Sequence, residues 1–156
     1  QKASNGFVTT PFTAGQLEEI IAQDGAFVTE INEKVVAYLY GGSWSYYDQW
    51  PIFPYMTSRF PRWKTQHPIT TANSFQYGPV CIDSAHRGKK IINRLFETLR
   101  LEFADKYPLA GTFINQANSI STRAHLKIGW EIADEFEYND NRYFGLVYNM
   151  NNEVII

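Results

Sequence analysis

At 156 residues the chain is long enough for one domain with a substantial core and too short for two. Its 44% hydrophobic and 19% charged residues exclude a disordered chain, and its net charge of −2 argues against nucleic acid as the main partner. No apolar run approaches the ~18–20 residues of a membrane span, and the single cysteine, Cys81, excludes a disulfide framework or a cysteine-rich zinc site. We therefore expect one domain over residues 1–156, without a metal and without a membrane partner, in a reducing cytoplasm.

The first half of the chain predicts a helix, a β-hairpin and a long aromatic segment. Thr13 can cap a helix over residues 14–23, whose apolar side chains recur at helical spacing. Residues 26–31 and 35–42 flank a short polar turn and are typical of a hairpin. Residues 43–72 are rich in proline and aromatic residues, and such long irregular segments are commonly functional loops or lids.

The second half predicts alternating strands and helices. Gly78-Pro79 lies inside a predicted strand and favours a bulge or a splay there, since proline cannot donate to a strand ladder. Asn118 and Gly129 are suited to cap the two ends of a helix. The expected strands are residues 75–82, 110–116, 130–138 and 142–150, and the expected helices begin near Lys89 and at Asn118.

The order of elements indicates the fold class. A helix and two strands are followed by a loop, a strand, a helix, a strand, a helix and two strands. A strand–helix–strand unit implies parallel pairing with a right-handed crossover. We therefore predict an α/β or α+β fold with a single mixed sheet flanked by helices.

Basic residues surround a glycine where a predicted strand turns into a helix. The strand ends at Ile82, and the helix beginning near Lys89 leaves free backbone N–H groups at the corner. These groups and the helix dipole can hold an anion, and Arg87, Lys90 and Arg94 add positive charge nearby. Taken alone, the pattern is equally typical of a tight turn with solvated lysines.

Two segments occur together in a specific order and spacing. VCIDSAHRGKKIINRLFETL (residues 80–99) follows a pattern of a strand, Arg-Gly-x-Gly-x-Gly/Ala and a helix. NSISTRAHLKIGW (residues 118–130) follows Asn-x-x-Ala/Ser, three residues, a tyrosine position, and an ending like Lys-x-Gly-Phe. In this the chain resembles the GNAT superfamily of acetyl-CoA-dependent N-acyltransferases over residues 14 to about 150. The resemblance implies a GNAT-like fold whose sheet is splayed at its centre, here apparently lacking the family's N-terminal strand and helix.

The resemblance also implies acetyl-CoA as acyl donor and assigns the residues that would bind it. The backbone of the strand would pair with the pantetheine amides, the corner amides would hold the pyrophosphate, and an asparagine would bind the pantetheine arm. The implied cofactor-binding residues are Val80, Cys81, Ile82, Arg87, Gly88, Lys89, Lys90, Ile91, Ile92 and Asn118. Lys90 and Ile92 stand where the family has glycine or alanine, which allow close approach of a ligand. Lys90 keeps its amide, whereas Ile92 either continues the apolar stripe of the helix or crowds the pyrophosphate.

The implied chemistry is direct attack of a neutral amine on the thioester, assisted by a base and an acid. His125 occupies the place of the tyrosine that serves as the general acid in the family. Ser121 lies four residues earlier on the same helix face. Asp83, at the end of the strand, is the candidate base, with Asp48 or water as alternatives. Cys81 is expected to be buried in its strand.

The acceptor would be a primary amine of a small molecule or a peptide. Trp44, Tyr46, Tyr47 and Trp50 are candidate walls of its pocket, since aromatic walls suit apolar or cationic groups, whereas the alternative for the aromatic cluster of residues 44–63 is packing as a core. A non-catalytic module of the same fold, binding coenzyme A or a protein partner, is the alternative. A missing first strand would leave a raw sheet edge, which a second copy could cover in a homodimer, with the apolar C-terminal EVII as a candidate contact.

Overall fold

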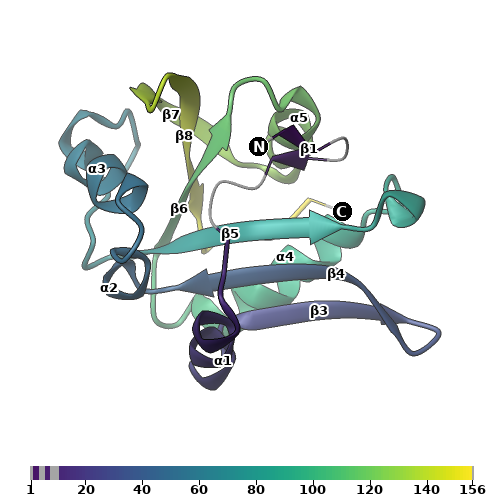
Figure 1. The fold of residues 1–156 in the computed structure, drawn as a ribbon. Coiled ribbons are helices and arrows are strands. Elements are labelled where there is room, and N and C mark those ends of the chain that lie inside the picture. Colours follow the sequence, from purple (N-terminus) through teal and green to yellow (C-terminus); the bar gives the residue numbers. More distant parts are fainter. Residues whose placement is uncertain (1, 4–5, 8–10, 156) are drawn as a thin grey trace.

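A computed structural model describes residues 2–3, 6–7 and 11–155 (Figure 1). Six strands form one mixed sheet in the order β3-β4-β5-β6-β8-β7. These strands are β3 (Ala26–Ile31), β4 (Lys34–Gly42), β5 (Ser74–Ile82), β6 (Leu109–Asn115), β7 (Glu131–Tyr138) and β8 (Asn141–Asn149). The helices are α1 (Ala14–Ala22), α2 (Trp44–Tyr47), α3 (Ile52–Ser58), α4 (Ile91–Phe103) and α5 (Ser119–Ile128), with short 3₁₀ turns η1 (Phe60–Arg62) and η2 (Ser84–His86). The two-residue strands β1 (Lys2–Ala3) and β2 (Gly6–Phe7) pair only with each other. The predicted class and element order are confirmed.

Local signals fix the ends of two helices. Thr13 caps α1 through a capping box, in which its side chain accepts from the Gln16 N–H while the Gln16 side chain accepts from the Thr13 N–H. Asn118 caps α5 by accepting from the Ser121 N–H, and Gly129 ends that helix with a φ of 122°. None of the described helices has the length and apolar character needed to cross a membrane.

The sheet divides into two halves, which separate at its centre. β5 pairs in parallel with β6 only from Ser74 to Gln76, opposite Leu109 to Gly111. Beyond that point β5 continues beside β4, while β6 continues beside β8. The divergence begins next to Gly78-Pro79, whose peptide bond is cis. In Figure 1 the two strands leave their common end in different directions. The predicted splay is therefore present.

Two hydrophobic clusters cover the two faces of the sheet. One contains the apolar stripe of α4, including Leu95, Phe96 and Leu99, which are at most 4% exposed. The other contains the aromatic residues of α2 and α3, together with Ile20 of α1. The segment 43–72, predicted to be irregular apart from a short helix, contains two short helices and a 3₁₀ turn, whose aromatic side chains fill the second cluster.

Two expectations about exposure are corrected. Cys81 is exposed, because Val80 and Ile82 point toward the core cluster and Cys81 therefore faces the opposite side of β5. The C-terminal segment does not lie along the free edge of β3. Val154 is instead 7% exposed within the α4 cluster, and the Asn93 side chain donates to the carbonyl of Ile155.

Candidate functional site

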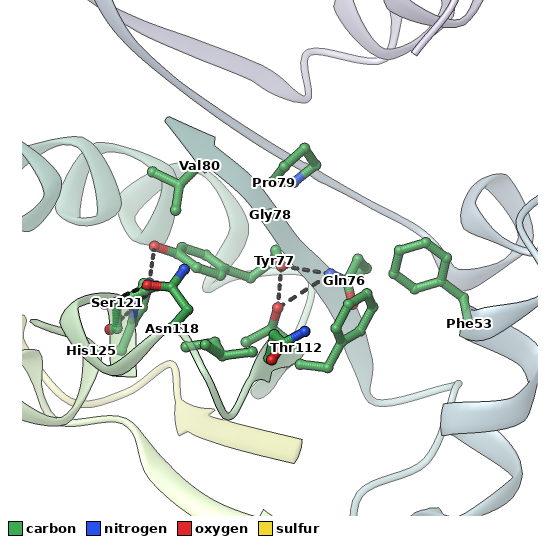
Figure 2. A pocket seen from close by; sticks show the side chains of 13 residues that line it. Phe53, Gln76, Tyr77, Gly78, Pro79, Val80, Thr112, Asn118, Ser121 and His125 are labelled. Atoms are coloured by element: carbon green, nitrogen blue, oxygen red, sulfur yellow. Dashed lines mark hydrogen bonds between the residues drawn. The ribbon is translucent and has the colours of Figure 1, made fainter. Parts of the chain in front are cut away.

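A cleft opens where β5 and β6 diverge (Figure 2). It encloses about 630 Å³ of empty space, part of it open to solvent. Its walls are Phe53 of α3, residues 76–80 of β5, residues 112–115 at the end of β6, the α5 cap Asn118, and Ser121 and His125 of α5. The cleft thus brings Val80, at the start of one motif segment, together with Asn118, Ser121 and His125 of the other.

Side chains satisfy the carbonyl groups that β5 exposes as it leaves β6. The Thr112 hydroxyl donates to the Tyr77 carbonyl at 2.7 Å, and the Gln76 Nε2 donates to the same oxygen at 2.6 Å. The Tyr47 hydroxyl donates to the Gly78 carbonyl at 2.7 Å. Buried carbonyl groups need such partners when a strand ladder ends. These bonds hold the strands apart without filling the space between them.

His125 lies at the bottom of the cleft as a buried, neutral side chain. It is 1% exposed, and burial lowers the pKa of its imidazole to about 4, an effect that its hydrogen bond to the Ser121 backbone only partly offsets. The Nδ1 lies 2.7 Å from the Ser121 carbonyl, which can only accept, so Nδ1 carries the proton. The Nε2 therefore accepts from the Tyr77 hydroxyl at 2.9 Å, and burial raises the pKa of that hydroxyl.

This arrangement does not support the expectation that His125 supplies a proton at its ordinary pKa. Both ring nitrogens already have partners, and the imidazolium is scarcely populated at neutral pH. Ser121 is half-buried, lines the cleft, and keeps its hydroxyl 3.3 Å from Nδ1. Its hydroxyl is thus a proton donor that faces the cleft.

The corner between β5 and α4 presents backbone N–H groups. Within the described part of the chain, no acceptor is found for the N–H groups of residues 88 to 93. Gly88 has a φ of 79°, and a Cβ built on it would meet no atom within 4 Å. The side chains of Arg87, Lys89, Lys90 and Arg94 are exposed around it. The corner is therefore open, positively charged and suited to an anion.

The two departures from the family pattern have different structural outcomes. Lys90 adopts a left-handed conformation with a φ of 60°, which explains why glycine suits this position. Its side chain is exposed and leaves the amide accessible. Ile92 packs against the α4 core cluster, as its place in the apolar stripe predicts.

The predicted aromatic wall of the acceptor pocket needs correction. Trp44, Tyr46 and Tyr47 are at most 8% exposed, because α2 packs their side chains into the second core cluster. Trp50 is half-buried beside them and, like them, does not line the cleft. The aromatic lining of the cleft comes instead from Phe53, Tyr77 and Phe113, none of which was predicted as an acceptor wall.

Other predicted site residues lie outside the cleft. Asp83 is exposed and accepts from the Ala85 N–H, so its carboxylate caps the η2 turn. Gln76 and Thr112, by contrast, line the cleft and were missed, because a polar residue inside a strand pattern gives no sign of what it faces. Among the described residues, no group of three or more His, Cys, Asp or Glu side chains is placed to hold a metal ion.

No protein-family profile matches the chain, and no curated protein matches it. Solved structures do. An N-acetyltransferase from Staphylococcus aureus Mu50 aligns with a TM-score of 0.62 and 19% identity over 92% of this chain and 81% of that one. Ribosomal-protein-alanine N-acetyltransferase from Brucella melitensis aligns with a TM-score of 0.61 and 17% identity over 86% of this chain and 75% of that one. A putative acetyltransferase from Salmonella typhimurium, solved with its cofactor acetyl-CoA, aligns with a TM-score of 0.61 and 15% identity over 88% of this chain and 72% of that one. The fold of this chain is therefore that of the GNAT acetyltransferases.

Proposed function

We propose that this protein is an acetyl-CoA-dependent N-acetyltransferase that acts on a primary amine. The observation that carries the proposal is the alignment of two features along β5. The strand separates from β6 at Gln76, and it ends at a corner whose backbone N–H groups have no acceptor within the described chain. A long ligand with an anionic end and an amide-containing arm can bind along the free edge of β5, with its anionic end at the corner.

The residues present fit coenzyme A in three places. The open, basic corner around Gly88 suits the diphosphate, since nothing lies within 4 Å of the position of an added Cβ. The backbone of Val80, Cys81 and Ile82 pairs with β4 on one side only, which leaves its other edge for the pantetheine amides. Asn118 lines the cleft beside them.

When bound, acetyl-CoA would supply a thioester whose carbonyl carbon is open to attack by an amine. The amine nitrogen forms the new C–N bond, the C–S bond breaks, and one proton moves from the amine to the leaving sulfur. We assign the delivery of that proton to the Ser121 hydroxyl, because it faces the cleft while both nitrogens of His125 are engaged. His125 then acts as a positioning residue, because its hydrogen bonds fix the Tyr77 hydroxyl and the Ser121 carbonyl in place.

Release of free thiol from acetyl-CoA, measured with a panel of primary amines, tests the proposal. We expect amine-dependent thiol release together with N-acetylated product detected by mass spectrometry. Ser121→Ala should lower kcat by about a hundredfold, the lower end of the range for general acid–base catalysis, and leave acetyl-CoA binding intact. Failure to bind acetyl-CoA at millimolar concentration would exclude the proposal.

A non-catalytic module that binds coenzyme A is the second candidate. The observation that favours it is the lining of the cleft, to which the described residues contribute no Asp or Glu side chain as a base. The two candidates separate in the same assay. Binding of acetyl-CoA without thiol release for any amine would favour the module.

A further inference from the structure

Among the described residues, nothing pairs with one buried polar atom of Gln76, at the point where β5 and β6 separate. The residue is 3% exposed and lines the cleft. Its Nε2 donates to the Tyr77 carbonyl at 2.6 Å and lies 3.3 Å from the Thr112 hydroxyl, but its Oε1 has no hydrogen-bond partner within the described part of the chain. Figure 2 shows these two dashed contacts and labels Phe53, which also lines the cleft.

The orientation of the Gln76 amide is fixed by its neighbours. The Tyr77 carbonyl can only accept, so the amide atom that contacts it must be the NH₂ group. The Thr112 hydroxyl already donates its proton to that carbonyl, and it can therefore accept from the same NH₂ group. Oε1 consequently remains an acceptor, and its missing partner must be a donor. A buried acceptor without a donor costs about 1–3 kcal/mol, which makes a ligand N–H at this place favourable.

The charge of the cleft restricts what that donor can be. Among the described residues that line it there is no Asp, Glu, Lys, Arg or Cys side chain. The titratable groups are Tyr77 and His125, which bond to each other and are both neutral at pH 7. The nearby Tyr47 hydroxyl is committed to the Gly78 carbonyl. An alkylammonium ion entering this space would lose its hydration without gaining a counter-charge, which is strongly unfavourable.

We propose, on the basis of the proposed function, that Gln76 Oε1 accepts a hydrogen bond from an uncharged acceptor amine, and that the cleft thereby selects primary amines of low basicity. A neutral amine donates one N–H to Oε1 and keeps its lone pair for the thioester carbon. An ammonium has no lone pair and finds no carboxylate to remove its proton. Phe53 and Phe113 add apolar walls at the same point, so an amine beside an apolar or aromatic group fits best.

The size of the selection follows from ordinary acidity. A peptide-type α-amine, with a pKa of about 7.7–8.0, is about 14% neutral at pH 7, whereas an alkylamine with a pKa of about 10.4 is about 0.04% neutral. The neutral fractions differ about 300-fold. The stronger nucleophilicity of the alkylamine recovers part of this difference. We therefore expect kcat/KM for the α-amine to exceed that for the alkylamine by at least about tenfold at pH 7.

Matched amine pairs measure this preference. The pairs are phenylalaninamide with phenethylamine and glycinamide with ethylamine. The first member of each pair carries a carboxamide that the second lacks, and this group lowers the basicity of its amine. The wild-type protein should prefer the first member of each pair. Gln76→Glu places a carboxylate at the same position, where it can pair with an ammonium and take its proton. The preference should then fall by about tenfold or reverse.

Thr112→Val is the matched control. It removes another side chain that donates to the Tyr77 carbonyl but leaves Gln76 Oε1 in place, so it should keep the wild-type ratio between the two amines. Gln76→Leu removes the acceptor and should raise KM for phenylalaninamide while the affinity for acetyl-CoA, measured by calorimetry, stays unchanged. This variant also serves if Gln76→Glu does not fold.

The outcomes separate this inference from the function on which it rests. A wild-type protein that does not bind acetyl-CoA defeats both. A wild-type protein that acetylates alkylamines as well as α-amines, or that binds acetyl-CoA but acetylates neither pair, defeats the inference alone. So does a loss of acetyl-CoA affinity in Gln76→Leu with an unchanged KM for the amine, because the donor to Oε1 would then belong to the cofactor.

Discussion

The buried imidazole of His125 should make the stability of the protein depend on pH in a defined window. Its pKa is about 4 in the folded protein, against an ordinary value of 6.5. The unfolded chain therefore binds more protons than the folded one between these two values. The contribution of neutral His125 to the free energy of unfolding is fully present above pH 6.5, and it is lost as the pH falls toward 4. At about 1.4 kcal/mol per pKa unit, the difference between the two pKa values corresponds to about 3 kcal/mol of unfolding free energy.

The perturbation that isolates this contribution is His125→Phe, which cannot titrate. The variant leaves the Tyr77 hydroxyl without its acceptor, so it should be less stable than wild type at pH 7 by about 1–3 kcal/mol. As the pH is lowered from 6.5 to 4, wild type should lose about 3 kcal/mol more than the variant, and the difference between the two proteins should shrink or change sign.

Urea unfolding at half-unit steps between pH 4 and pH 8 measures the effect. His67→Phe is the matched control, because the His67 side chain is exposed and its replacement should leave the pH dependence as in wild type. If the difference between wild type and His125→Phe stays constant across this range, the imidazole is not buried as described. Its assignment as a neutral positioning residue would then be wrong.

Three further substitutions test contacts around the site. Gly145→Ala places a Cβ 2.7 Å from the Trp63 ring and should cost about 1–3 kcal/mol in urea unfolding; no loss would mean that the ring does not pack there. Asp134→Asn removes a two-bond ion pair with Arg59, with distances of 2.7 and 3.1 Å, and should cost about 1–2 kcal/mol at low salt and less at 1 M salt. A cost independent of salt would contradict the ion-pair account. Lys90→Gly relieves a left-handed residue at a φ of 60° and should raise the melting temperature slightly without abolishing acetyl-CoA binding, and a clear fall in melting temperature would contradict this.

Features governed by neighbouring residues were predictable from the sequence. The capping box at Thr13, the cap at Asn118 and the left-handed Gly129 depend only on residues within one turn. The hairpin turn at Asn139-Asp140 is equally local, and both residues adopt positive φ values, as the turn requires. Gly78-Pro79 indicated the splay because proline cannot continue a ladder.

Features that depend on distant segments were not predictable. From the sequence, Trp44, Tyr46, Tyr47 and Trp50 could either pack as a core or line a pocket, and only the placement of α2 against the sheet decides for the core. Arg100 lies on what reads as the polar face of α4, yet it is 9% exposed because the C-terminal segment crosses that face and its Met150 carbonyl accepts from the guanidinium. Gln76 gave no signal at all, since its place where β5 and β6 separate depends on the pairing of distant segments.

Calorimetric titration of acetyl-CoA into wild type, Gly88→Ala and Gly88→Glu tests the central claim most directly. A side chain at Gly88 enters open space beside the free N–H groups but adopts a φ of 79°, so Gly88→Ala reports the backbone strain alone. We predict binding to wild type, weakened binding to Gly88→Ala, and no detectable heat with Gly88→Glu, whose carboxylate competes with the diphosphate. Equal affinity in all three proteins would show that the diphosphate is held elsewhere and would contradict the account.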